Sequence, residues 1–271
     1  MTSQQCIGAS KDTKEGADAA SQWKVYYFNA PTRGEQVRML LRITNTPFED
    51  ITFKGEEGMK YKPASMGDLS PATFNQFPCV VDPDGNFLAQ TTAIMQHIGR
   101  SVGLAPETPM EDALALSLTL ASEDMRGKVF YKVLQPEVIR RILIAKCACL
   151  GCSCCVGCIS KLLGRGPNTF QEGFNNLDSQ LSNFERFIRL HGKGGPFLLG
   201  STMYYCDVAV YDCISEQFVG CRVTDANAYL TEHKFNLLKV FYNRMHVIFQ
   251  PFVDARGGYA VDLIAKEHGG K

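Results

Sequence analysis

Six cysteines crowd into twelve positions near the middle of this chain, and thiols at such spacings can hold soft metal ions. The six are Cys147, Cys149, Cys152, Cys154, Cys155 and Cys158. The C-x-C, C-C and C-x-x-C spacings suit zinc or copper(I). The surrounding segment, 142–163, is apolar with basic residues on both sides, which favours S-acylation and membrane association instead. A third interpretation gives the segment no dedicated chemistry, and metal binding is the least favoured of the three.

Two other places carry groups that can act on a thiol or an anion. Tyr27 ends a short run of strand-forming residues, and a phenol that donates a hydrogen bond to a thiolate lowers the pKa of that thiol. Tyr26 would point to the opposite face, so only one of the pair can serve, and either could simply pack in a core. Gln90 and Thr91 stand where a helix begins, with Thr91 expected as its N-cap. A helix N-terminus offers N–H groups to an anion.

A small α/β unit must position these residues. Residues 24–28 and 48–53 read as strands, and the helical pattern between them makes a βαβ unit with parallel strands. The turn residues 82–85, Asp-Pro-Asp-Gly, join two short strands, 79–82 and 86–89, into a hairpin. The sequence therefore predicts a small mixed sheet with helices packed on it.

Everything after a proline-containing linker reads as helix. We expect a mobile polar tail over 1–22, the α/β domain over 23–102 and the linker over 103–110. An all-helical domain is expected over 111–265, interrupted by the cysteine-rich insertion at about 142–166. The predicted fold class is an α/β N-terminal domain followed by an all-α C-terminal domain.

Five segments, in order, resemble segments of the cytosolic glutathione transferases of sigma, pi and mu type. VYYFNAPTRGEQVRMLL is similar to their first strand and helix, where an end-of-strand Tyr precedes an Arg-(Ala/Gly)-Glu helix start. QFPCV resembles their segment with a cis-proline. The remaining three are AQTTAI, SEDMRGK and FNLLKVFYNRMHVIFQPF. The resemblance covers roughly residues 23–255 apart from the insertion. It implies that the N-terminal domain is thioredoxin-like.

The resemblance also implies an activity. Glutathione would be the co-substrate, and Tyr27 the catalytic residue that stabilises its thiolate for attack on hydrophobic electrophiles, a detoxification reaction. The residues implied to bind glutathione are Tyr27, Arg33, Lys62, Gln76, Phe77, Pro78, Gln90, Thr91 and Asp124. The electrophile would lie near residues 29–32, Phe130 and Tyr131. The alternatives are a non-catalytic ligand-binding or structural protein on this fold, or a glutathione-dependent isomerase or peroxidase.

Each part of glutathione is matched to a position. The Phe77 backbone would pair with the cysteinyl part, as an added strand does. The helix start at Thr91 would hold the γ-glutamyl carboxylate. Lys62, with Lys60 as its competitor, would pair with the glycine carboxylate. Asp124 would reach across a homodimer interface to the γ-glutamyl amine.

Two departures from the family pattern are visible. A Trp usually helps to hold the glycine end of glutathione, but Gly58 stands there and the single Trp is Trp23. A Ser or Thr usually caps the helix that begins near Asp207, but Tyr204 occupies that position. Asp207 is retained, so half of a capping box is expected.

Composition limits the remaining possibilities. The 271 residues are 45% hydrophobic with a formal net charge of zero, so no overall field draws the protein to nucleic acid. Residues 1–22 lack the apolar run of a signal peptide. Eleven cysteines fit a reducing compartment. We expect a cytoplasmic protein, peripheral to a membrane if the insertion is acylated, with glutathione as partner and no assigned metal.

Overall fold

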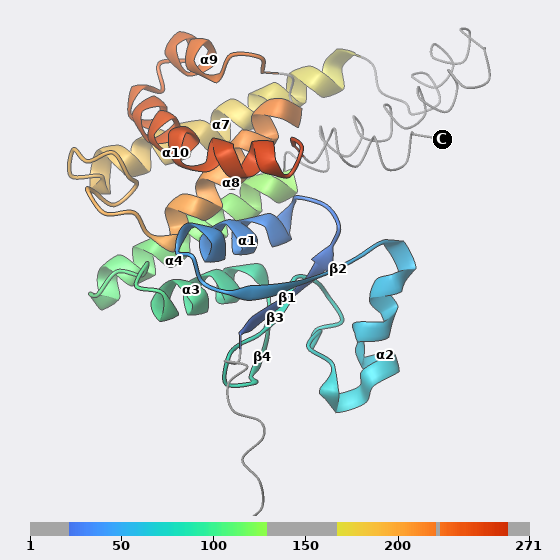
Figure 1. Cartoon of the computed structure of the whole chain (residues 1–271). Coiled ribbons are helices and arrows are strands. Elements are labelled where there is room, and N and C mark those ends of the chain that lie inside the picture. The colour runs from blue at the N-terminus through green and yellow to red at the C-terminus, as the bar shows by residue number, and fades with distance from the viewer. Residues whose placement is uncertain (1–21, 129–166, 221–222, 260–271) are drawn as a thin grey trace, which may run out of the picture.

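A computed structural model describes residues 22–128, 167–220 and 223–259 of the chain (Figure 1). The cysteine-rich segment 142–163 lies outside the described residues, and so do Phe130 and Tyr131. The three interpretations of that segment, and the part of the electrophile site assigned to Phe130 and Tyr131, therefore stay predictions.

The N-terminal region is built on a four-stranded mixed sheet of order β2-β1-β3-β4. The strands are β1 (Trp23–Phe28), β2 (Phe48–Phe53), β3 (Cys79–Val81) and β4 (Phe87–Ala89). β1 pairs with β2 in parallel and with β3 antiparallel, and β3 pairs antiparallel with β4. These pairings confirm the predicted βαβ unit and hairpin. Gly85 closes the hairpin turn with a φ of 87°, a conformation that glycine adopts without strain.

Two helices lie between the sheet and the C-terminal helices, and a short one lies on the other side of the sheet (Figure 1). The two inner helices are α1 (Arg33–Ile43) and α3 (Thr91–Ser101). The outer one is α2 (Pro63–Met66), flanked by the 3₁₀ turns η1 (Gly55–Tyr61) and η2 (Gly67–Leu69). The sheet and these helices form the thioredoxin-like domain.

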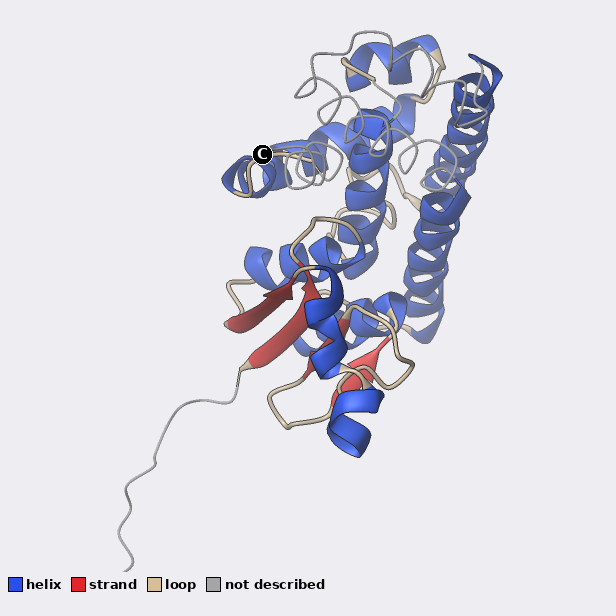
Figure 2. Cartoon of the chain, turned by 90° about the vertical axis from the view of Figure 1, so that its right-hand side faces the viewer, coloured by secondary structure: helices blue, strands red, loops and turns tan. Residues whose placement is uncertain are grey.

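The rest of the described chain is helical (Figure 2). Its helices are α4 (Pro109–Met125), α7 (Pro167–His191), α8 (Tyr205–Gly220), α9 (Ala226–Glu232) and α10 (Asn236–Ala255). The predicted fold class is therefore confirmed. α4 begins two residues before the predicted 111 because Pro109 takes its first position, and the Thr108 hydroxyl accepts a hydrogen bond from the Glu111 N–H at 3.2 Å. None of the helices in the described ranges is long and apolar enough to cross a bilayer.

The start of α8 confirms the half capping box. The Asp207 carboxylate accepts hydrogen bonds from the backbone N–H groups of Tyr204, at 2.7 Å, and Leu198, at 2.8 Å. Burial raises the pKa of Asp207 to about 7. The Asp207 N–H, to which a Ser or Thr cap would offer its side chain, donates to the Tyr204 backbone carbonyl at 3.0 Å instead.

Helix α8 is the buried centre of the molecule. Every residue from Tyr205 to Phe218 is buried, and α8 contacts α1, α3, α4 and α10. The contact with α3 is tight, since a Cβ built on Gly99 would lie 2.7 Å from Cδ1 of Tyr205. Gly99 thus lets the thioredoxin-like domain approach the helical region closely.

We predict that Gly99→Val destabilises this contact by roughly 1–3 kcal/mol, because its side chain must displace the Tyr205 ring. Thermal unfolding measures the effect. Ser101→Val, at an exposed position of the same helix, controls for the helix propensity of valine. Equal melting temperatures for the two variants would contradict the prediction.

Candidate functional site

Tyr27 is buried at the end of β1, with its phenol turned toward α1. The residue is 6% exposed, and its ring packs against Gly34 so closely that a Cβ there would lie 2.3 Å from Cδ1. The Tyr27 hydroxyl lies 2.5 Å from Oγ1 of Thr32. Tyr26 points to the other face and packs against Tyr61, with 5.1 Å between ring centroids. The prediction that the two side chains point to opposite faces of the strand is confirmed.

The surroundings of Tyr27 keep its proton in place. Burial raises the pKa of Tyr27 above its ordinary value, against the hydrogen bond to Thr32 and the charges of Arg126, Arg33 and Arg38. The phenol is therefore protonated at neutral pH, and its O–H can act as a hydrogen-bond donor.

A groove of about 660 Å³ runs between the thioredoxin-like domain and α4. Seven of the nine predicted site residues line it: Arg33, Lys62, Gln76, Phe77, Pro78, Gln90 and Thr91. Tyr27 is not among the lining residues. Its chain neighbour Phe28 is, and so is Arg33, the neighbour of its hydrogen-bond partner Thr32. The charge of Arg33, which lines the groove, acts to lower the pKa of Tyr27 against the effect of burial, so the phenol lies near this lining residue without being part of the lining itself.

Two backbone features shape the groove. The Phe77–Pro78 peptide bond is cis, which confirms the prediction drawn from QFPCV. Asn75 and Gln90 have positive φ angles of 58° and 74°. Asn tolerates this region, whereas Gln rarely occupies it, so Gln90 holds a strained backbone at the groove. Its Nε2 lies 3.4 Å from Oε1 of Gln76.

The prediction that Thr91 is the N-cap of α3 is wrong by one residue. Thr91 is the first helical residue and Gln90 occupies the cap position, without a side-chain capping bond. The positive φ of Gln90 turns the chain before helical dihedrals begin. Gln90, Thr91 and Thr92 all line the groove, so the positive end of the α3 dipole faces it.

Charged side chains from the thioredoxin-like domain and from α4 line the groove. Lys62 lines it, with its Nζ 5.9 Å from the Phe77 ring centroid. The competing Lys60 is exposed and lies over Tyr61 instead. At the α4 side, the Arg33 Nε donates to Glu123 Oε2 at 2.7 Å, and the Gln36 amide donates to Oε1 at 2.9 Å.

Glu123 is the main groove residue that the sequence did not predict. Burial raises its pKa, but the charges of Arg126 and Arg33 outweigh burial and lower the pKa below its ordinary value. Its neighbour Asp124, which was predicted, is exposed and does not line this groove. The adjacent acidic residues Glu123 and Asp124 in SEDMRGK were the sequence signal that could have pointed to Glu123. The other lining residues not predicted for glutathione binding are Phe28, Asn75, Thr92 and Leu120.

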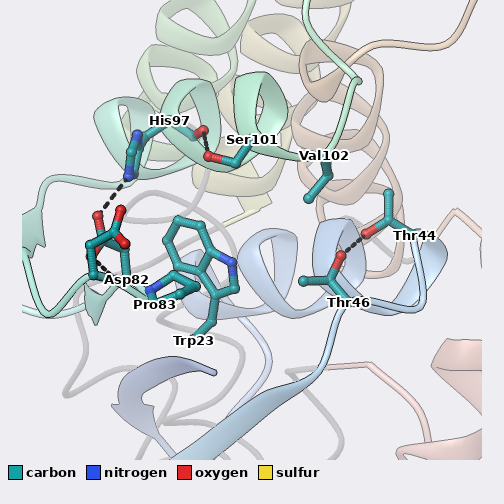
Figure 3. A pocket seen from close by; sticks show the side chains of 9 residues that line it. Trp23, Thr44, Thr46, Asp82, Pro83, His97, Ser101 and Val102 are labelled. Atoms are coloured by element: carbon teal, nitrogen blue, oxygen red, sulfur yellow. Dashed lines mark hydrogen bonds and ion pairs between the residues drawn. The ribbon is translucent and has the colours of Figure 1, made fainter. Parts of the chain in front are cut away.

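A second hollow, of about 480 Å³, lies where β1 begins, and its polar side chains bond to one another (Figure 3). His97 Nε2 lies 3.2 Å from Asp82, while the Ser101 hydroxyl donates to the His97 carbonyl at 2.9 Å. The three residues therefore form no catalytic relay. Trp23 lies here, 5.4 Å from His97 between ring centroids, and so cannot replace the missing Trp of the groove. Within the described ranges, no three His, Cys, Asp or Glu side chains gather as a metal site.

Glu123 contacts a buried ion pair between α4 and α8. Arg126, 2% exposed, donates to Asp212 of α8 at 2.8 Å, and its Nε lies 3.4 Å from Glu123. Asp212 is fully buried. The pair thus ties the α4 side of the groove to the central helix.

We predict that Asp212→Ala costs about 3–5 kcal/mol, because Arg126 is left buried without this counter-ion. Chemical denaturation measures the loss. The double variant Arg126→Met with Asp212→Leu should recover most of it. Glu49→Ala, which breaks a half-exposed pair with Lys24, should change stability by less than about 1 kcal/mol. If Asp212→Ala lowered the free energy of unfolding by no more than Glu49→Ala does, the Arg126–Asp212 pair would not have this structural role.

Comparisons with known proteins point to one family. A family model described as "Glutathione S-transferase, N-terminal domain" matches residues 23–100. The chain is 30% identical to "Probable glutathione S-transferase 7" of Caenorhabditis elegans over 188 residues, covering 69% of this chain and 76% of that protein. It is 24% identical to "Glutathione S-transferase 4" of the same organism over 226 residues, or 83% and 91% of the two chains.

A solved structure shows the same fold. The crystal structure of the glutathione S-transferase from Ascaris lumbricoides superposes with a TM-score of 0.61 at 22% identity. The match covers 88% of this chain and 99% of that one.

Proposed function

Because this chain belongs to the glutathione S-transferase family and is a glutathione transferase, we propose that Tyr27 activates the thiol of glutathione bound in the groove beside Phe77 and Pro78. The observation that carries the proposal is a buried, protonated phenol that is close enough to Arg33, a lining residue of that groove, to be influenced by its charge.

The chemistry needs a thiolate. A free thiol has a pKa of about 8.5, so only a few per cent is ionised at neutral pH. A phenol that donates a hydrogen bond favours the charged sulfur, and a drop of about two units, roughly 2.7 kcal/mol, would ionise most of it. The Tyr27 side chain keeps the proton that such a bond requires.

The groove has a group for each part of the tripeptide. The Phe77 backbone, beside the cis peptide bond and ahead of β3, is suited to pair with the cysteinyl backbone. The N-terminus of α3, with Thr91, is suited to hold the γ-glutamyl carboxylate. Lys62 is the cation for the glycine carboxylate, and Gln76 and Gln90 are available as further hydrogen-bond partners. Arg33 adds positive charge beside the phenol.

The glycine end is held without an indole. A Cβ built on Gly58 would lie 2.6 Å from the ring of Phe53, so a larger side chain at that position would have to displace this buried ring. Phe53 in turn packs on Phe77, with 4.7 Å between ring centroids. Lys62 therefore carries more of the contact with this end of glutathione.

The second substrate is a hydrophobic electrophile. Phe28 and Leu120, which are 38% and 51% exposed, line the groove and offer it an apolar surface. The thiolate would attack the electrophilic atom as the leaving group departs. A detoxification role in the cytoplasm fits this chemistry. A non-catalytic carrier on this fold is not favoured, since two relatives that the chain matches over more than two thirds of its length are named as glutathione S-transferases.

Tyr27→Phe tests the proposal, with Tyr26→Phe, on the other face of the strand, as its matched control. We predict that the pKa of bound glutathione, followed by thiolate absorbance, rises by about two units in Tyr27→Phe because the anion loses its donor. The rising limb of the activity–pH profile moves up equally, and conjugation of an aromatic halide at neutral pH falls at least about tenfold. An unchanged thiol pKa would rule out this role for Tyr27.

We also propose that the protein is a homodimer in which Asp124 serves the groove of the partner. Asp124 is exposed and does not line its own groove. Two large apolar side chains shortly before the groove residue Asn75 in the chain are exposed, Phe74 at 63% and Leu69 at 70%. A second copy of the chain would cover such an apolar surface.

We predict that Asp124→Asn raises the KM for glutathione roughly fivefold, the effect of about 1 kcal/mol, while kcat changes little. Asp84→Asn, at the second hollow, controls for the loss of one surface charge. Light scattering gives the oligomeric state in parallel. A monomer, or an unchanged KM, would count against the shared site.

A further inference from the structure

Thr32 occupies the N-cap position of α1, yet its side chain does not cap the helix. The Glu35 N–H bonds to the Thr32 backbone carbonyl at 2.9 Å instead. A threonine at this position normally gives its hydroxyl to a free N–H of the first turn. Here the hydroxyl lies 2.5 Å from that of Tyr27, so it is committed to the phenol.

The loop that carries Thr32 is held firmly. Arg38, which is 4% exposed, donates to the carbonyl groups of Phe28 at 3.2 Å and Ala30 at 3.3 Å. The same guanidinium pairs with Asp50 at 3.0 Å. Arg38 therefore fixes the turn between β1 and α1, which sets the distance from Thr32 to the Tyr27 hydroxyl.

Proton counting assigns the donor in this contact. The hydroxyl groups of Tyr27 and Thr32 carry one proton each. Only one of these two protons can lie between the two oxygens and form their hydrogen bond. A thiolate is an acceptor and has no proton to give. When Tyr27 directs its proton to a bound sulfur, the bond between the two oxygens needs the proton of Thr32. Threonine can supply it, because its hydroxyl rotates and both donates and accepts.

We propose that Thr32 is a positioning residue for the proposed role of Tyr27, donating its hydroxyl proton to the phenol oxygen when Tyr27 bonds the glutathione thiolate. Donation into an oxygen strengthens the hydrogen bond that this oxygen's own proton makes, because chains of hydrogen bonds polarise one another. The short chain Thr32–Tyr27–sulfur thus lowers the thiol pKa further than the phenol would alone.

Thr32→Val removes the hydroxyl and keeps the shape of the side chain, whereas Thr32→Ser restores the hydroxyl. With glutathione as the probe, Thr32→Val should raise the pKa of the bound thiol by about half to one unit. The rate of aromatic halide conjugation at neutral pH should fall roughly three- to tenfold, with the KM for glutathione nearly unchanged. Thr32→Ser should return the thiol pKa most of the way. Circular dichroism checks that each variant is folded.

The same substitution in a Tyr27→Phe background separates this inference from the function on which it rests. Since Thr32 acts through the phenol, Thr32→Val should have no further effect on the thiol pKa there. An equal rise in both backgrounds would overturn the inference and place Thr32 on the sulfur itself. A lowered or unchanged pKa in the single variant would also overturn it. Failure of the proposed function shows separately, as an unchanged pKa in Tyr27→Phe alone.

Discussion

The packing of α8 against α1, α3 and α4 is the constraint on which the other features of this protein depend. The groove lies between the thioredoxin-like domain and α4, so its two walls belong to different regions of the chain. Their separation is fixed because both rest on the same buried helix. Gly99 sets how closely α3 can approach α8, and Arg126 with Asp212 ties α4 to it.

The charges of the site follow from this arrangement. Glu123 contacts both Arg33 and Arg126. The two positive charges lower the pKa of Glu123, so this carboxylate stays ionised at the groove and serves as counter-ion to both arginines. Tyr27 lies among the same arginines, yet burial still dominates and keeps its proton on. Tyr27 is therefore a neutral hydrogen-bond donor within a positive field, a combination suited to the sulfur anion that we propose it binds.

Local patterns predicted the fold well. Strand alternation, the Asp-Pro-Asp-Gly turn and the helical spacing placed the strands to within a residue or two, because these signals act between near neighbours. The cis bond before Pro78 and the groove position of Lys62 came from the family resemblance. Glu123 was missed because its importance comes from Arg33 and Gln36 on another helix, a contact that no local pattern encodes. The start of α3 was misplaced because a glutamine gives no sign of a positive φ.

That unusual backbone at Gln90 limits how the enzyme could be made more heat-resistant. Replacing a left-handed non-glycine residue with glycine is a standard way to relieve strain, worth on the order of 1 kcal/mol or more. At Gln90 the same change would delete a side chain from the groove and loosen the turn that aims the α3 dipole at it. Glycine at this position would therefore relieve backbone strain and at the same time alter the groove, so stabilising substitutions are better sought elsewhere in the chain.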